Sequence, residues 1–308
     1  MMSKQATLHQ LEVFAAIAKT GSFTKAADEL FLTQPTVSQQ MKQLTKAIGV
    51  PLYEQIGRRI FLTEAGRAVL QASENISLCL DQLQETISAL QGMKKGHLRL
   101  ATITTGKYFV PRLLGLFRQH YPGIKISLQI GNRQQILERL ANNQDDLYFL
   151  GKPPKDLDIN IRHFLDNPLV VIAPRNHPLV KEKKISLDQL MQEPLIMRES
   201  GSGTRMAVEE FLAENRLTMN VEMEISNNEA IKQAVYGGLG LSILSIYSLI
   251  LEGLDGPLAV LDVDGFPIKK HWYIIYSNGK QLSIVAQTFL DYLLTHNNDE
   301  VLSLSQLL

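Results

Sequence analysis

The sequence predicts an α/β protein of three parts: a mainly helical, winged helix-turn-helix N-terminal domain, a long linker helix and a two-lobed C-terminal domain. Three observations predict this class. Residues 21–44 read as two short helices with a tight turn between them. Apolar residues then repeat with heptad spacing over residues 69–90, and from residue 97 strand-like and helix-like segments alternate. At 308 residues the chain is long enough for two or three domains with their own cores.

The second helix of the N-terminal pair has an apolar stripe and a polar face. Val37, Met41 and Leu44 recur at helical spacing, and Thr33 is placed to cap the helix through its hydroxyl. Residues 30–53 contain no Asp or Glu, as a helix lying against phosphates requires. In a helix-turn-helix such a helix enters the DNA major groove. The alternative is an ordinary helical hairpin in a protein core.

A basic turn follows this pair of helices. Gly57-Arg58-Arg59 lies between two short apolar runs, a pattern typical of a hairpin wing that sets arginines against the DNA backbone or minor groove. A solvated turn is the alternative. The candidate DNA-contacting residues are Ser22, Thr24, Thr33, Gln34, Pro35, Thr36, Ser38, Gln39, Lys42, Arg58 and Arg59.

The next segment is expected to be a long helix. Residues 64–91 contain no proline, and their only glycine, Gly66, lies at the start. The narrow apolar seam favours pairing with a second copy of the chain over burial as a core helix of one subunit. Two paired DNA-binding domains would recognise two half-sites related by an approximate dyad. The candidate dimerisation residues are Val69, Ile76, Leu80, Leu83, Ile87 and Leu90.

Residues 92–96 break the helix, and two α/β subdomains are expected after them. Two subdomains joined by two crossovers leave a cleft at the carboxyl ends of their strands. Residues 102–106 and 198–205 each follow a strand and precede a helix, and their hydroxyls, backbone N–H groups and arginines suit a small anion. A simple tight turn at Gly201 and Gly203 is the alternative. The candidate effector-binding residues are Thr104, Thr105, Arg198, Ser202, Gly203, Thr204 and Arg205.

Composition narrows the class of protein. The 31 basic and 31 acidic residues balance, so DNA affinity must come from placed contacts and dimerisation instead of bulk charge. The single cysteine, Cys79, excludes an internal disulfide and fits a reducing compartment. The polar start and the lack of a long apolar run predict a cytoplasmic protein with no membrane partner. The seven histidines lack metal-ligand spacing and Ser202 lacks a nearby base, so no metal, cofactor or enzymatic activity is expected.

Three motifs carry a resemblance to a known family. Ser22–Ala27, Thr33–Ser38 and Leu62–Gly66 resemble the winged-helix domain of LysR-type transcriptional regulators, although Gln55 stands where many members have an arginine. The resemblance covers essentially the whole chain and implies a dimerising linker helix and an effector domain like a periplasmic binding protein. The expected boundaries are 1–64 for the DNA-binding domain, 65–92 for the linker helix and 93–308 for the effector domain. Within the latter, lobe I comprises 93–163 and 269–308, and lobe II comprises 164–268.

A narrower resemblance rests on residues 146–154, 172–179 and 198–205, which are similar to the CbbR and RbcR type of this family. It implies control of Rubisco, carbon-fixation and inorganic-carbon uptake genes by a small anionic effector, a phosphorylated sugar or organic acid. It also implies a dimer or tetramer on double-stranded DNA, in the cytoplasm or, for an algal chain, the plastid stroma. Control of another metabolic pathway by a LysR-type regulator is the alternative. A solute-binding protein or an enzyme is disfavoured, because neither explains the basic wing and the heptads.

Overall fold

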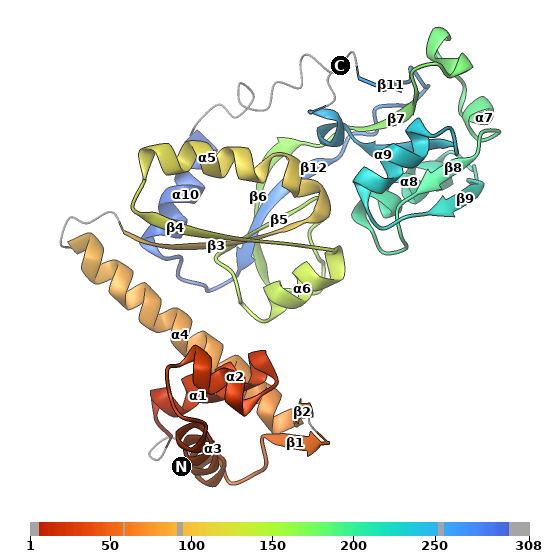
Figure 1. The fold of residues 1–308 in the computed structure, drawn as a ribbon. Coiled ribbons are helices and arrows are strands. Elements are labelled where there is room, and N and C mark those ends of the chain that lie inside the picture. Colours follow the sequence, from red (N-terminus) through yellow and green to blue (C-terminus); the bar gives the residue numbers. More distant parts are fainter. Residues whose placement is uncertain (1–5, 58, 91–94, 252–255, 296–308) are drawn as a thin grey trace. The chain divides into compact units, whose positions relative to one another are not determined.

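The computed structural model describes residues 6–57, 59–90, 95–251 and 256–295 (Figure 1). The chain forms two compact units, residues 1–84 and 85–308. Within the described segments, no helix combines the length and the apolar character needed to cross a membrane.

The N-terminal unit packs three short helices against a hairpin and the first part of a long helix. Its elements are α1 (Leu8–Thr20), α2 (Phe23–Glu29), α3 (Gln34–Ile48), β1 (Tyr53–Ile56), β2 (Arg59–Leu62) and α4 (Glu64–Leu90). The two strands pair in antiparallel fashion. The core includes Val13, Phe14, Ala26, Ala27, Val37, Met41, Leu44 and Leu52. The predicted helix-turn-helix and wing are therefore present.

Local signals in the sequence set the ends of these helices. The side chains of Thr7, Ser22 and Thr33 each accept a hydrogen bond from a backbone N–H in the first turn of α1, α2 and α3. Gly21 and Gly49 end α1 and α3 with φ of 64° and 88°, a left-handed conformation that favours glycine. These residues fix where α2 and α3 begin relative to each other.

The apolar seam of α4 changes its environment along the helix. Val69 packs against the N-terminal core, and the buried Ser73 hydroxyl donates to the Leu11 carbonyl at 3.1 Å. Farther along, the apolar side chains are exposed to solvent in one chain: Ile76, Leu80, Leu83 and Ile87. The Leu90 side chain lies outside the described residues, as do residues 91–94 of the expected break.

The first sheet of the C-terminal unit has the strand order β4-β3-β5-β12-β6. Its strands are β3 (Gly96–Ile103), β4 (Ile124–Gly131), β5 (Leu147–Leu150), β6 (Ile159–Asp166) and β12 (His271–Ser277). The single turn of 3₁₀-helix η1 (Thr104–Tyr108) follows β3 directly, and the sheet is flanked by α5 (Val110–His120), α6 (Arg133–Ala141) and α10 (Ile284–Thr295). Strands β3, β4 and β5 are parallel, whereas β12 runs antiparallel to both β5 and β6.

The second sheet has the order β11-β7-β10-β8-β9. Its strands are β7 (Leu169–Pro174), β8 (Leu195–Met197), β9 (Val221–Glu224), β10 (Leu241–Ser245) and β11 (Leu258–Val260). Its helices are α7 (Leu187–Leu190), α8 (Gly203–Glu214) and α9 (Asn228–Tyr236), with 3₁₀ turns η2 (Pro178–Lys181) and η3 (Ile246–Leu249). We refer to the two halves built on the first and second sheets as lobe I and lobe II.

The lobes are joined by two segments and share apolar contacts. Residues 167–168 lead from β6 into β7, and residues 261–270 lead from β11 back to β12. At the junction Phe109 of lobe I stacks against Tyr247 of lobe II, with ring centroids 5.2 Å apart, and against Trp272 at 4.9 Å. The two-lobed prediction is confirmed, but both sheets are mixed instead of parallel, because β12 and β7 are laid antiparallel to their neighbours. The exact domain boundaries stay predictions.

Candidate functional site

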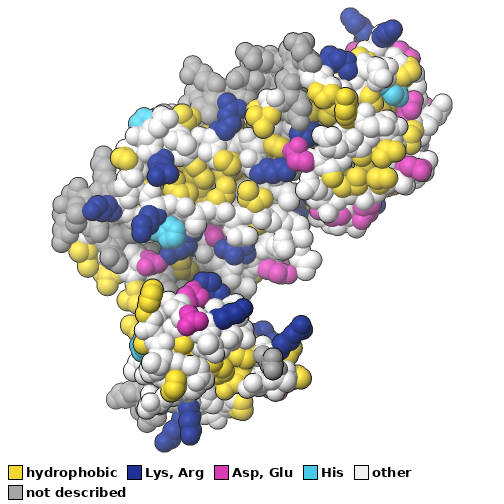
Figure 2. All heavy atoms as spheres, viewed as in Figure 1, with side chains coloured by type: hydrophobic (Ala, Val, Ile, Leu, Met, Phe, Trp, Pro, Cys, Tyr) yellow, Lys and Arg dark blue, Asp and Glu magenta, His cyan; other side chains and the backbone are white. Residues whose placement is uncertain are grey.

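The polar face of α3 lies in a groove of the N-terminal unit. The groove has a volume of about 1150 Å³ and is lined by α2, α3 and the wing. Five predicted DNA-contacting residues line it: Ser22, Thr24, Gln34, Ser38 and Lys42. In Figure 2 the lowest part of the molecule, which is the N-terminal unit, carries several projecting Lys and Arg side chains.

The other predicted DNA contacts fall into two groups. Thr33 and Thr36 bond each other through their hydroxyls at 2.8 Å, so their side chains help to start α3. The remaining members, Pro35, Gln39 and Arg59, are exposed, and Arg58 lies outside the described residues. Contact of any of these residues with DNA stays a prediction.

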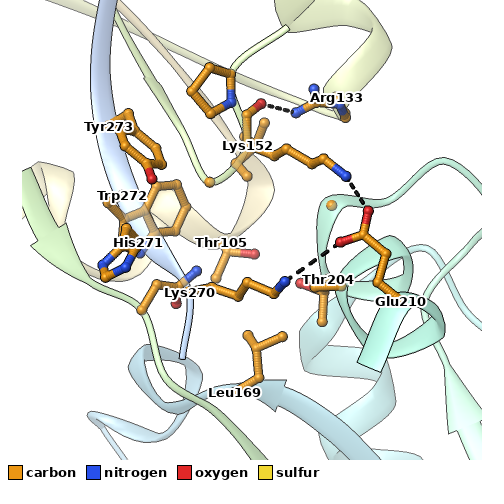
Figure 3. A pocket seen from close by; sticks show the side chains of 16 residues that line it. Thr105, Arg133, Lys152, Leu169, Thr204, Glu210, Lys270, His271, Trp272 and Tyr273 are labelled. Atoms are coloured by element: carbon orange, nitrogen blue, oxygen red, sulfur yellow. Dashed lines mark hydrogen bonds and ion pairs between the residues drawn. The ribbon is translucent and has the colours of Figure 1, made fainter. Parts of the chain in front are cut away.

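A small cavity of about 180 Å³ lies between the two lobes of the C-terminal unit (Figure 3). Lobe I supplies the end of β3, η1, the start of α6 and the loop after β5, while lobe II supplies α8 from Gly203 to Glu210. Both joining segments contribute as well, through Asn167 and Lys270. The cavity therefore lies where movement of one lobe against the other would change its shape.

Three cationic side chains and one carboxylate line this cavity: Arg133, Lys152, Lys270 and Glu210. Lys152 and Lys270 both reach Glu210 of α8, the second at 3.5 Å (Figure 3). The hydrogen bond from Lys152 is the main reason that the pKa of Glu210 is lowered. Arg133 donates to the Lys152 carbonyl at 2.6 Å. The cavity lining thus has three cationic side chains and one carboxylate, which leaves an excess of positive charge.

Neutral donors complete the lining. The hydroxyl-bearing Thr105 is 3 % exposed, and Gly203 and Thr204 form the start of α8, whose first backbone N–H groups favour an anion. Trp272 lines the cavity too. Its buried Nε1 has no hydrogen-bond partner among the residues that the structure describes.

The two predicted arginines are engaged elsewhere. Arg198 is 3 % exposed and donates to Glu199, to Asn228 at 2.7 Å and to Thr104 at 3.2 Å. Arg205 pairs with Glu209 at 2.8 Å and with Glu224. The lining contains three of the seven predicted residues: Thr105, Gly203 and Thr204. Ser202, the N-cap of α8, is buried beside them.

Sequence reasoning missed the cavity's own cations. Arg133, Lys152 and Lys270 come from three distant segments, and no local motif joins them. One signal was available, since Lys152 lies two residues after the end of β5, and the residues after a parallel strand lie at the edge of a sheet where ligands bind.

Two family models match the chain. The model described as "Bacterial regulatory helix-turn-helix protein, lysR family" matches residues 8–67, and the model described as "LysR substrate binding domain" matches residues 91–298. The chain belongs to the LysR family of transcriptional regulators. The family predicted from the motifs is thereby confirmed.

Relatives of this LysR-family chain include carbon-fixation regulators. It is 83% identical over 304 residues, 99% of each chain, to the HTH-type transcriptional activator CmpR of Synechocystis sp. strain PCC 6803. It is 48% identical, over 97% of each chain, to the RuBisCO operon transcriptional regulator of Acidithiobacillus ferrooxidans. The solved regulatory domain of CcmR from Synechocystis PCC6803, in complex with 2-PG, is 53% identical with a TM-score of 0.62, covering 64% of this chain and 95% of that domain.

Proposed function

We propose that this chain regulates carbon-fixation or inorganic-carbon uptake genes, and that a small anionic metabolite bound between its lobes is the signal. The relatives support the regulated genes, since one is a RuBisCO operon regulator and another is the activator CmpR. The CcmR domain, solved with 2-PG bound, supports the class of ligand. We infer that the chain acts by binding alone, with no enzymatic activity and no cofactor.

The observation that carries the ligand proposal is the excess of positive charge in the cavity. Three cationic side chains converge there against one carboxylate, beside two threonines and a helix N-terminus. A phosphorylated acid such as 2-PG has two acidic groups, which suit lysines and an arginine held apart on different elements. In this proposal the ligand replaces Glu210 as the partner of Lys152 and Lys270.

Replacement of Glu210 would change the contact between the lobes. Lys152 belongs to lobe I and Glu210 to lobe II, so their ion pair links the two lobes. A ligand held by Thr105 and Lys152 on one side and by Thr204 on the other would substitute a different link. We propose that the altered lobe closure is the event that the DNA-binding domains respond to through the linker helices.

On the DNA side we propose that α3 enters the major groove and that the wing contacts the backbone or minor groove. Pairing of two α4 helices through their exposed apolar residues would place two such domains on dyad-related half-sites. The chain would then act as a dimer or as a tetramer of two dimers.

The test is footprinting of the full-length protein at promoters of carbon-fixation and carbon-uptake genes, with and without 2-PG. We expect protected half-sites in both conditions and a changed pattern with 2-PG. The dephosphorylated acid is the ligand control, and Thr105→Ala with Thr204→Ala should remove the 2-PG effect while keeping DNA binding. No protection at these promoters would exclude the proposed genes. Protection that 2-PG leaves unchanged in the wild-type chain would exclude 2-PG as a signal that alters DNA binding.

A further inference from the structure

Two histidines and an aspartate meet on the surface of lobe I where the lobes are joined. His163 and Asp166 lie on β6, and His271 is the first residue of β12. The Asp166 Oδ1 atom is 2.9 Å from His271 Nδ1 and 3.9 Å from His163 Nε2, and the two imidazole nitrogens are 3.1 Å apart. We call these three residues the histidine cluster.

An irregularity in the sheet creates this cluster. Residues three apart on a regular strand point to opposite faces, so His163 and Asp166 would ordinarily diverge. Here the pairing of β6 with β12 shifts between Trp272 and Tyr273, so that Asp166 faces His271 while His163 faces Tyr273. The bulge therefore brings His163 to the same face as Asp166 and His271. Bulges of this kind commonly re-aim a side chain next to a functional site.

The protons available do not satisfy these contacts. The His271 Nδ1 atom lies between the Asp166 carboxylate and the His163 nitrogen, and a neutral ring carries at most one proton at that atom. If that proton serves Asp166, the same nitrogen has no lone pair left to accept a hydrogen bond from His163, so the contact between the two rings is unsatisfied. A cation held by all three atoms removes the conflict.

We propose that the histidine cluster binds one divalent transition-metal ion, with Zn²⁺ the best match. Zinc bound by imidazole at about 2.0–2.1 Å in tetrahedral geometry separates its ligand atoms by about 3.3 Å, close to the three distances in the cluster. Two imidazoles and one carboxylate are a common zinc ligand set, and exposure of His163 and Asp166 beside the half-buried His271 leaves the fourth position to water. No local motif in the sequence indicates this site, because His163 and His271 are 108 residues apart.

The position of the cluster gives the ion a structural consequence. Asp166 directly precedes the segment that leads into lobe II, and His271 directly follows the segment that returns from it. The Asp166 carbonyl is also held by the Tyr247 hydroxyl of lobe II at 3.1 Å. A bound ion would cross-link the two strands at the joint, and it would fix His271, which lines the interlobe cavity.

The test is zinc binding to the full-length, tag-free protein after removal of metals with a chelator. Titration calorimetry should give one zinc per chain, and His163→Gln or His271→Gln should each weaken binding by at least about tenfold. His9→Gln is the matched control, because His9 is an exposed histidine 3.5 Å from the carboxylate of Glu12 with no second histidine in its ion pair. We expect this variant to bind zinc as the wild type does.

Cobalt provides a second readout that does not depend on affinity. Co²⁺ added to the wild type should give the visible absorption of a tetrahedral site, and Asp166→Asn should reduce or change that spectrum. Thermal unfolding in chelator should be the same for all variants, because the three side chains are on the surface. The absence of saturable zinc binding, or binding that survives in both histidine variants, would overturn the proposal.

Discussion

Glu210 is the side chain whose charge opposes the proposed ligand most directly. Among the described residues that line the interlobe cavity it is the sole carboxylate, and it pairs with both Lys152 and Lys270. Its carboxylate is about half exposed, so the ion pairs are screened and each contributes at most about 1 kcal/mol. In this proposal Glu210 keeps both lysines paired, so that anions from solvent do not bind them before the ligand does. Displacing Glu210 then reduces the binding free energy of the ligand by a modest amount.

We expect Glu210→Gln to raise the affinity for 2-PG by up to about fivefold, because the ligand no longer displaces a carboxylate from the two lysines. Titration calorimetry on the full-length chain measures it. Glu209→Gln is the matched control, since Glu209 is the neighbouring carboxylate of α8 but pairs with Arg205. Weaker binding in Glu210→Gln than in this control would mean that Glu210 holds the ligand instead of competing with it.

At the residue scale the sequence predicts well what depends on neighbours in the chain. The cap at Thr33 follows from a short-range rule, and the structure has it. Arg198 shows the limit. Its place after a strand and before a glycine-rich turn suggested an anion site. In the structure, however, the Arg198 guanidinium donates hydrogen bonds to Asn228 and Thr104, which are 30 and 94 residues away in the sequence. Nothing local in the sequence indicates such partners.

Helix α3 is the element that would select the DNA sequence to which the protein binds. Gln34 and Gln39 are exposed on it, and Gln34 is preorganised by its hydrogen bond to Ser38 at 2.9 Å. Glutamine reads base edges, and each such contact contributes about 1–3 kcal/mol of discrimination.

We therefore expect Gln34→Ala with Gln39→Ala to weaken binding to the specific operator at least about tenfold more than binding to random DNA. Electrophoretic mobility shifts on both DNAs, at fixed salt, measure the two losses. Lys42→Ala is the control, since a phosphate contact should weaken both DNAs alike and reduce the salt slope by about one. If the glutamine variant lost affinity equally on the two DNAs, Gln34 and Gln39 would only position the protein on DNA and would not read its base sequence.

Helix α4 carries the prediction about assembly. Four of its apolar side chains beyond Ser73, those of Ile76, Leu80, Leu83 and Ile87, are exposed in one chain, which a stable soluble helix avoids by pairing. Leu80→Glu with Leu83→Glu places four like charges across a paired seam, so we expect the dimer to dissociate to monomer in sedimentation experiments. Asn75→Glu adds charge to an exposed position on the same helix outside the heptad set and should stay dimeric. A dimer that survives the double variant would assign the association to another surface.

Two strands show why element prediction from sequence stops where it does. Strand β7 and helices α8 and α9 can be recognised in the sequence, because a continuous apolar run or a helical period marks each one. Strand β6 was not foreseen. It is an edge strand with mostly exposed side chains and a bulge, so its sequence lacks a buried stripe. Strand β11 is only three residues long and is likewise at an edge.

At the scale of the whole molecule, the helix-turn-helix with its basic wing, the heptads, and the alternation of strands and helices were enough to predict a DNA-binding part, a linker helix and a two-lobed part. The composition of the cavity was not, because Arg133, Lys152 and Lys270 come from three distant segments that only the tertiary fold brings together. The same holds for the histidine cluster, which depends on a bulge between strands far apart in the chain. Function at these sites is a property of tertiary contacts, and a sequence read in short windows does not contain it.

The proposed coupling between ligand and DNA has a consequence that needs no knowledge of how the two units are arranged. If 2-PG changes operator affinity by some factor, operator DNA must change 2-PG affinity by the same factor, because the two binding free energies are linked. Couplings of this kind usually amount to about 1–3 kcal/mol, or about 5- to 150-fold. Calorimetry with and without operator DNA measures the change in 2-PG affinity, and mobility shifts with and without 2-PG measure the change in operator affinity. We expect the two changes to be equal factors in the full-length protein. Thr105→Ala with Thr204→Ala should bring both factors to one. If the wild type already gives factors of one while binding both partners, the ligand acts after DNA binding, on a third component, and the lobe-closure mechanism is wrong.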